Sequence, residues 1–377
     1  MTNINVSTSP SSPGPSSPVG VKPSGSSAAL SPSSNPLFDD DSEDTPGEHE
    51  HDPTSNELIQ VGDDAYSDYA SASDYSDNTS VTSSIRAYLF HNGRRYHRYG
   101  GQGKYVLPND EAEQDRLDLH HHLALMVLDA KLHTVKLPEN LHRVLDCGTG
   151  TGIWALEFGA MHPEAVVTGV DLSPIQPNWV ETNVRFEVDD LEKEWTWREN
   201  HFQFIHSRNI TNGIRDFGKY VSQMYKHTSP GGVVEISENL HDIHCQDGTI
   251  NGTRLEEFWK QYKECSAKAG FRFPKKEDIE NYLQEAGFED VTAKIYVMPW
   301  GPWARDKRLR RIGHVLAAVA ETGMEAYGLQ LLTTFGDYTV EQARSLFVDA
   351  MKEMMTLKVH AYQYMVQVTG RKPTDAN

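Results

Sequence analysis

Three glycines alternate with threonines directly after Asp146, at positions Gly148, Gly150 and Gly152. Glycine lets a backbone turn sharply and pass close to a ligand. A phosphate-binding P-loop would end in Gly-Lys-Ser or Gly-Lys-Thr, whereas Ile153 follows the last glycine here. The dinucleotide pattern G-x-G-x-x-G is also weakened, because Ile153 occupies its sixth position. The pattern Asp-x-Gly-x-Gly-x-Gly is instead suited to an adenosyl ligand that carries no phosphates.

Acidic residues end the next two predicted strands. Asp171 lies 19 residues after Gly152, where a carboxylate can accept hydrogen bonds from both hydroxyls of a ribose. Asp189 and Asp190 end the following strand, where a carboxylate and backbone groups can pair with the adenine amino edge. Ligands of open α/β sheets bind at the carboxyl ends of strands, so these residues are expected to line one site together with Asp146.

The elements that must position these residues alternate between strand and helix from residue 142 onward. Helices are predicted over Ile153–Met161 and Asp216–His227, between short apolar segments. This alternation predicts a parallel sheet covered on both faces. The predicted strands are His142–Cys147, Ala165–Asp171, Val184–Val188, Phe202–Ser207 and Gly232–Ser237, the last preceded by a turn at Pro230-Gly231-Gly232.

Helical segments flank this core on both sides. Asn109 is expected to cap a helix that runs to about His133. Two insertions, 239–275 and 300–357, are apolar and periodic, which favours a lid or a substrate wall over a linker. A helix Glu277–Ala286, closed by Gly287, precedes a strand Val291–Met298, and Lys358–Val368 is the predicted final strand.

The N-terminal 84 residues differ in composition from the rest of the chain. The whole chain has 377 residues and a net charge of −19, and residues 1–84 carry −13 of it. Residues 1–36 contain 12 Ser and 7 Pro, so they lack the apolar side chains of a core. We therefore predict a disordered tail over 1–84 and an ordered domain over 85–377. Its core sheet is expected at about 142–237, 278–299 and 358–370.

Composition excludes several classes of protein. An acidic chain, with pI near 5.3, lacks the basic surface of a nucleic-acid-binding protein. Apolar runs are too short to span a membrane, so no membrane partner is expected. Three cysteines without a CxxC pair do not form a disulfide framework, which favours a reduced compartment, cytoplasmic or possibly nuclear.

Several motifs together resemble the fungal LaeA-like group of class I S-adenosylmethionine (SAM) dependent methyltransferases. The resemblance covers about residues 85–372. It implies a Rossmann-like fold with a seven-stranded, mostly parallel sheet and an antiparallel last strand, and SAM as the co-substrate. The motifs are the glycine loop, Tyr105–Glu111 with Glu113–Asp118, Phe204–Arg208, and Pro230-Gly231-Gly232 with Glu235.

Within this resemblance, further residues gain expected roles. Tyr105 is expected to close over the donor, since an aromatic face suits a cationic sulfonium. Ser207, in the fourth-strand motif, is assigned to the donor site. His206, His241 and His244 are the candidate general bases, because they follow the fourth and fifth strands.

A metal centre is not expected. Consecutive helix positions point about 100° apart, so His120-His121-His122 cannot converge on one ion. Glu238, His241, Asp242 and His244 form a better set of ligands, but they lack a recognised spacing.

Two functions remain open from the sequence. The first is a methyltransferase acting on a small molecule of fungal secondary metabolism. The second is a nuclear regulator that works through protein partners, with the acidic tail as a possible binding segment. An apolar pocket of roughly 300–1,000 Å³ formed by the insertions would favour a small acceptor, and an open acidic groove would favour protein.

Overall fold

The computed structural model describes residues 88–97 and 107–375. The predictions for the tail, 1–84, and for Tyr105 lie outside these residues. Within the described part, no helix combines the length and the apolar character needed to cross a membrane.

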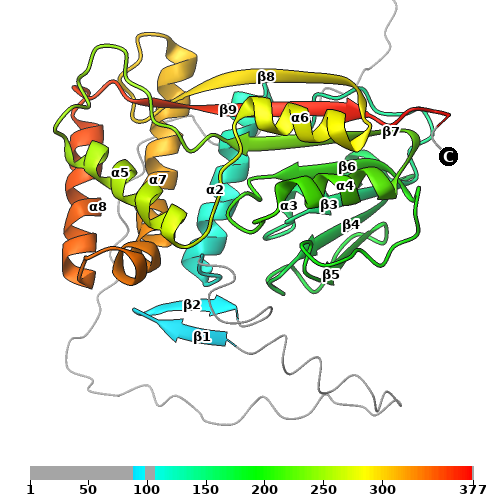
Figure 1. Ribbon diagram of the computed structural model, residues 1–377, viewed down its shortest axis with the longest axis horizontal. Helices are drawn as coiled ribbons and strands as arrows, with labels where there is room; N and C mark the ends of the chain where they lie inside the picture. Colours follow the sequence, from blue (N-terminus) through cyan, green and yellow to red (C-terminus); the bar gives the residue numbers. More distant parts are fainter. Residues whose placement is uncertain (1–87, 98–106, 376–377) are drawn as a thin grey trace, which may run out of the picture. The chain divides into compact units, whose positions relative to one another are not determined.

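Seven strands of the described chain form one sheet in the order β5-β4-β3-β6-β7-β9-β8 (Figure 1). The first five strands pair in parallel, and β9 lies antiparallel between β7 and β8. This confirms the predicted seven-stranded sheet with an antiparallel last strand. The strands are β3 (Arg143–Cys147), β4 (Val166–Asp171), β5 (Val184–Val188), β6 (Phe202–Arg208), β7 (Thr228–Asn239), β8 (Glu289–Pro299) and β9 (Tyr362–Arg371).

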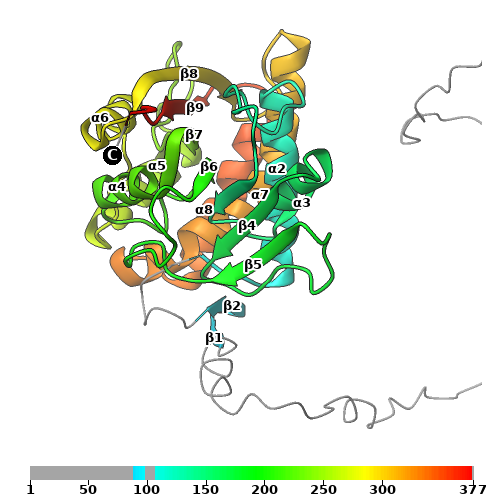
Figure 2. The ribbon, with the colours of Figure 1, turned by 90° about the vertical axis from the view of Figure 1, so that its right-hand side faces the viewer.

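Helices cover both faces of the sheet, as Figure 2 shows from the side. Successive strand residues point to opposite faces. In β3, Val144 therefore packs with Trp154 of α3 (Ile153–Met161), and α2 (Glu111–Val127) lies beside α3. Its neighbour Leu145 packs on the other face with Tyr220 of α4 (Phe217–His227) and Leu283 of α6 (Lys276–Ala286).

The two insertions build a separate helical wall. It consists of α5 (Arg254–Lys268), α7 (Lys307–Phe335) and α8 (Val340–Met355), which pack on one another and, through α7, on α2. Their facing side chains form the largest apolar cluster of the described residues. Figure 1 places this wall at one end of the sheet.

Several element boundaries differ from the sequence prediction, and α2 ends at Val127, before the expected His133. Asp110 caps α2 in place of Asn109, since its Oδ1 accepts the Glu113 N–H at 3.1 Å. Pro230-Gly231-Gly232 lies inside a longer β7. The final strand begins at Tyr362 rather than Lys358 and runs to Arg371. A two-stranded hairpin, β1 (Tyr88–His91) and β2 (Arg94–His97), precedes α2.

Candidate active site

The glycine loop joins the end of β3 to the start of α3. Gly148 and Gly150 have φ angles of +69° and +58°, which only glycine adopts without strain. Both line a cavity of about 1,180 Å³, a volume that includes the solvent at its mouth. A Cβ on Gly148 would lie 3.1 Å from Ile210 Cδ1, and one on Gly150 would lie 3.5 Å from Leu117 Cδ1. The loop backbone is therefore free to face a ligand in this cavity.

Asp171, at the end of β4, faces the same cavity. Its Oδ2 accepts the Gly150 N–H and its Oδ1 accepts the Ser173 N–H, each at 2.9 Å. These bonds fix the carboxylate and leave each oxygen a second lone pair. Burial nevertheless raises the pKa of Asp171 to about 6. A partly desolvated acceptor with free lone pairs suits the two hydroxyls of a ribose.

Asp146 is held from within the protein. Its Oδ1 lies 2.7 Å from His206 Nδ1, and its Oδ2 accepts the Thr149 hydroxyl at 2.6 Å. The His206 ring stacks on Trp154 with centroids 3.8 Å apart and planes at 2°. Asp146, His206 and Trp154 are each at most 2% exposed. His206 is thus held against Asp146 in the cavity lining, and its role as a base stays a prediction.

The far end of the cavity is formed by the end of β5. Asp189 and Asp190 line it, and Asp189 Oδ1 accepts the Asp190 N–H at 2.7 Å. Apolar side chains lie around them, which suits a flat aromatic base with a polar edge. They are Leu172, Leu191, Ile210 and Ile214.

Two predicted donor-site residues do not line this cavity. Ser207 is fully buried on the opposite face of β6, where it accepts the Tyr220 hydroxyl at 2.9 Å. Gly152 turns towards the sheet, and a Cβ there would lie 2.8 Å from Phe186 Cε1. The structure thus places Ser207 and Gly152 in packing contacts outside this cavity, and their assignment to the donor site stays a prediction. Tyr105 is not described, but Leu107, Pro108 and Asn109 do line the cavity.

The N-terminal half of α2 supplies polar side chains that sequence reasoning missed. Glu113 and Arg116 are each 2% exposed and form an ion pair of 2.6 Å beside the cavity. The Arg116 guanidinium also lies 5.0 Å from the centre of the Tyr327 ring, from α7. The sequence indicates this pair through its spacing, because oppositely charged residues three positions apart on a helix lie side by side.

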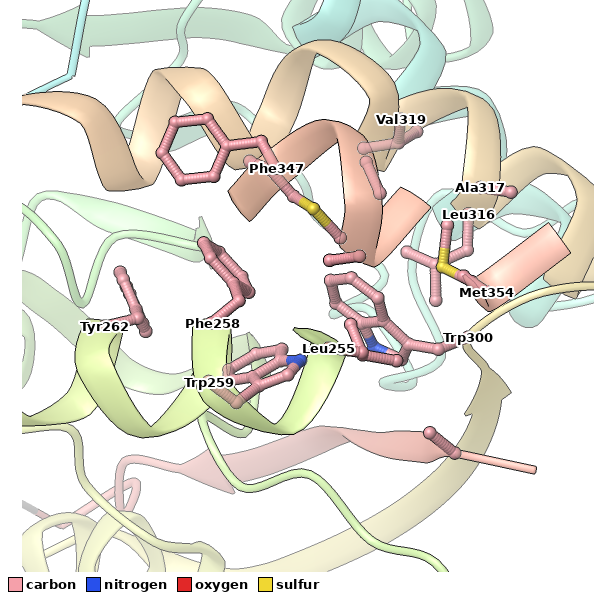
Figure 3. Packing of buried hydrophobic residues seen from close by; sticks show 14 of the residues in the cluster. Leu255, Phe258, Trp259, Tyr262, Trp300, Leu316, Ala317, Val319, Phe347 and Met354 are labelled. Carbon is pink, nitrogen blue, oxygen red and sulfur yellow. The ribbon is translucent and has the colours of Figure 1, made fainter. Parts of the chain in front are cut away.

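A second cavity, of about 670 Å³ with its mouth included, lies between the helical wall and the ends of β6 and β7. Phe258, Trp259 and Tyr262 of α5 form one side, and Trp300 follows β8. Figure 3 shows these aromatic rings between α5 and α7. Leu316, Val319, Ala320 and Met324 of α7 complete the apolar lining.

The two cavities meet. Arg116, His120, Asn209 and Tyr327 line both of them. A ligand in the first cavity and one in the second would therefore approach each other at this junction, which is formed by α2, α7 and the segment after β6.

The remaining candidate bases differ in position. His241 lines the second cavity, where its ring stacks on Phe273 at 3.7 Å, and burial lowers its pKa to about 3. His244 lines neither cavity: its backbone pairs with Tyr362 and its ring packs against Tyr362 and Tyr364. His244 lies outside both cavities because the chain after β7 continues beside β9, and its role as a base stays a prediction.

Comparisons with known proteins agree on one family. A family model described as a methyltransferase domain matches residues 115–293. Methyltransferase pytC of Aspergillus terreus is 37% identical over 297 residues, which are 78% of this chain and 91% of pytC. The secondary metabolism regulator laeA of Aspergillus fumisynnematus is 31% identical over 75% of this chain and 76% of its own. The protein-methionine methyltransferase laeA of Emericella nidulans is also 31% identical, over 75% of this chain and 76% of its own.

Proposed function

The chain belongs to the LaeA-like class I methyltransferases, which are SAM-dependent enzymes, and from this we propose that it methylates a small, largely apolar molecule of fungal secondary metabolism. SAM supplies a methyl group on a positively charged sulfur, already activated for displacement. The protein's own task is then to align donor and acceptor.

The first cavity is the proposed donor site. Gly148 and Gly150 give the donor close access to backbone, and Asp171 accepts hydrogen bonds from the ribose hydroxyls. Asp189 and Asp190 serve the polar edge of the adenine. Asp146 contributes through its fixed contacts to the loop and to His206. These roles follow from the geometry of the described residues and from the chemistry of their donors and acceptors.

The second cavity is the proposed acceptor site. The observation that carries this proposal is the shared lining at Arg116, His120, Asn209 and Tyr327, which lets two bound ligands meet. Aromatic and aliphatic side chains from α5, α7 and the segment after β8 make its lining mostly apolar, as in small-molecule pockets. A cavity lined by aromatic rings favours a small acceptor over a protein segment, although two of the relatives are named as a regulator and a protein methyltransferase.

Labelled SAM tests the proposal. Calorimetry on the full chain should first show SAM binding, and the Asp171→Ala variant should bind more weakly. Incubation with SAM carrying a labelled methyl group, and with separate metabolite and protein extracts, should then place the label in an organic-soluble small molecule. Label found in protein alone would refute a small acceptor.

A further inference from the structure

The acceptor cavity contains few side chains that can exchange a proton. Arg116 remains a cation, and burial raises the pKa of the Tyr262 and Tyr327 hydroxyls above the usual value, so neither tyrosine is a base near neutral pH. This leaves His120, His241 and Glu238. The ionisable lining consists of Arg116, His120, Glu238, His241, Tyr262 and Tyr327.

Both ring nitrogens of His120 are already engaged. Nδ1 lies 3.3 Å from Asn209 Nδ2, and Nε2 lies 2.9 Å from Asn239 Nδ2. Within the described chain, the buried Asn239 Oδ1 has no hydrogen-bond partner. Rotating that amide by 180° lets Oδ1 accept the Nε2–H of His120, while Nδ1 accepts from Asn209. Burial and nearby Arg116 lower the pKa of His120 to about 3, so the ring is neutral and both nitrogens are occupied.

His241 is occupied in the same way. Its Nδ1 lies 3.2 Å from the Tyr262 hydroxyl, and its Nε2 lies 3.4 Å from Thr211 Oγ1. The ring is held between Phe273 and Tyr262 by stacking. With a pKa lowered to about 3 by burial, this imidazole has little affinity for a proton at neutral pH.

Glu238 has different properties. It lies one residue before the end of β7 with an exposure of 1%, and its carboxylate accepts the Ile210 N–H at 2.8 Å and the Thr211 hydroxyl at 3.1 Å. Ile210 lines the donor cavity and Thr211 lines the acceptor cavity, so the carboxylate is attached to the segment that separates the two. The Thr211 N–H also donates to this carboxylate, which still has room for one further donor. Burial raises the pKa of Glu238 to about 7, despite these three hydrogen bonds.

We propose that Glu238 is the general base of this enzyme and that the acceptor is a weakly acidic hydroxyl, phenolic or enolic, on a flat ring system. The inference rests on the proposed small-molecule function. As the acceptor oxygen attacks the methyl carbon, the Glu238 carboxylate takes the hydroxyl proton. The new O–C bond forms, the S–C bond of the donor breaks, and its electron pair stays on the sulfur, which becomes a neutral thioether. The proton then passes from Glu238 to solvent on product release.

The choice of hydroxyl follows from matching proton affinities. A phenol such as the Tyr side chain has a pKa of about 10, within reach of a base near 7, whereas an aliphatic alcohol is far less acidic. The rings of Phe258, Trp259 and Trp300 offer flat apolar surfaces to a planar acceptor. The charged or titratable groups that face Glu238 are Arg116, His120, Tyr220, His241, Tyr262 and Tyr327.

The test uses the full chain, labelled SAM and two matched probes, 2-naphthol and 2-naphthylamine. Wild type should convert 2-naphthol to its methyl ether and leave the amine unmethylated. Glu238→Gln should lower kcat by about 100-fold or more, the usual range for a general base. Binding of SAM by calorimetry and of 2-naphthol by tryptophan fluorescence should change little. Glu187→Gln, a half-exposed glutamate of β5 outside both cavities, is the matched control and should behave as wild type.

Two readouts do not depend on a comparison of rates alone. The wild-type kcat should rise with pH to a plateau above about 7, and Glu238→Gln should lose this dependence. Infrared difference spectra between pH 5 and pH 8 should show carboxylic acid bands from Asp171 and Glu238, and Glu238→Gln should lose the one that titrates near pH 7, even without any acceptor. If the glutamine variant does not fold, Thr211→Val keeps the carboxyl group and removes one hydrogen bond to its charged form, which raises its pKa. The rise in kcat and the carboxylic acid band of Glu238 should then both move to higher pH, and a shift of the band without a shift of kcat would reject the base.

The outcomes separate the two proposals. Full turnover of 2-naphthol by a folded Glu238→Gln variant would reject the base and leave the methyltransferase function intact. Methylation of the amine in place of the naphthol would reject the hydroxyl acceptor. SAM binding without binding or methylation of either probe would overturn the flat small-molecule acceptor itself. A carboxyl group that is fully ionised at pH 5 would contradict the proton-accepting role near neutral pH.

Discussion

Gly150 and Gly152 allow a test that separates ligand binding from folding with a single methyl group. Both have positive φ, so alanine at either position costs about 1–2 kcal/mol of backbone strain. At Gly150 the added Cβ meets only Leu117 Cδ1, at 3.5 Å, an ordinary contact. At Gly152 it would overlap the Phe186 ring, with Cε1 at 2.8 Å and Cζ closer still.

The expected magnitudes follow from these contacts. Gly152→Ala adds overpacking of about 1–3 kcal/mol to the strain, for a total of about 2–5 kcal/mol. For a domain of this size, that corresponds to a fall in Tm of roughly 4–20 °C. Gly150→Ala should lower Tm by only a few degrees, since strain is its main cost. Because Gly150 faces the donor cavity and donates its N–H to Asp171, we expect it to weaken SAM binding by roughly tenfold or more.

Circular dichroism melting and SAM calorimetry on both variants provide the measurement. We expect Gly150→Ala to be stable but to bind SAM poorly. We expect Gly152→Ala to be less stable but, at temperatures below its Tm, to bind SAM as wild type does. A Gly150→Ala variant with wild-type SAM affinity would refute the assignment of the first cavity to the donor. Equal losses of Tm at both positions would refute the contrast drawn from the Phe186 contact.

Three further predictions use other residues. Asp171→Asn should weaken SAM binding by about 1–3 kcal/mol with the fold intact, because the ribose hydroxyls lose a charged acceptor; unchanged affinity in calorimetry would remove Asp171 from the site. Ala320→Phe, which fills part of the acceptor cavity, should cut acceptor turnover by about 100-fold through misplacement while SAM affinity stays the same; a parallel loss of SAM affinity would argue against two separate cavities. Glu238 has a folded pKa near 7, above the unfolded value of about 4.3, so its contribution to stability is complete below the unfolded value and is lost as pH rises through 7. Glu238→Gln should therefore gain Tm relative to wild type between pH 5 and pH 8, and a constant Tm difference across that range would contradict the shift.

The sheet was predictable because its signals are local. Short apolar segments alternate with helical ones, and each strand end carries a recognisable residue, such as Asp171 after β4. The cap of α2 was missed by one residue, since Asn109 and Asp110 are both good caps and only tertiary contacts decide between them. In β7 the sequence Pro-Gly-Gly signals a turn, and it lies where the register with β6 is irregular. The strand continues past it because Gly231 and Gly232 bond to the backbone of Lys372 and pairing resumes at Val233.

The residues around the donor cavity could be predicted in part from the sequence, whereas those around the acceptor cavity could not. His206 and Ser207 are consecutive in β6, so strand alternation allows one of them, and not both, to face the donor cavity. The acceptor side depends on contacts between residues far apart in the chain, such as His120 with Asn239, which no spacing reveals. The sequence does show Glu238 as an acidic residue near the carboxyl end of the fifth parallel strand. Only the cavity that it lines in the structure suggests a role as a base.

The position of β9 has a consequence for how this protein is made. β7 and β8 never pair with each other; β9 joins them, and the ribosome synthesises it after both. Until residues 362–371 emerge, the growing chain carries two strands with unpaired edges, separated from their common partner by α7 and α8. Unpaired edges favour aggregation. Translation of the last part of this chain is therefore the stage at which chaperone binding matters most, and premature termination after α8 leaves an acceptor wall with no strand to hold it to the sheet.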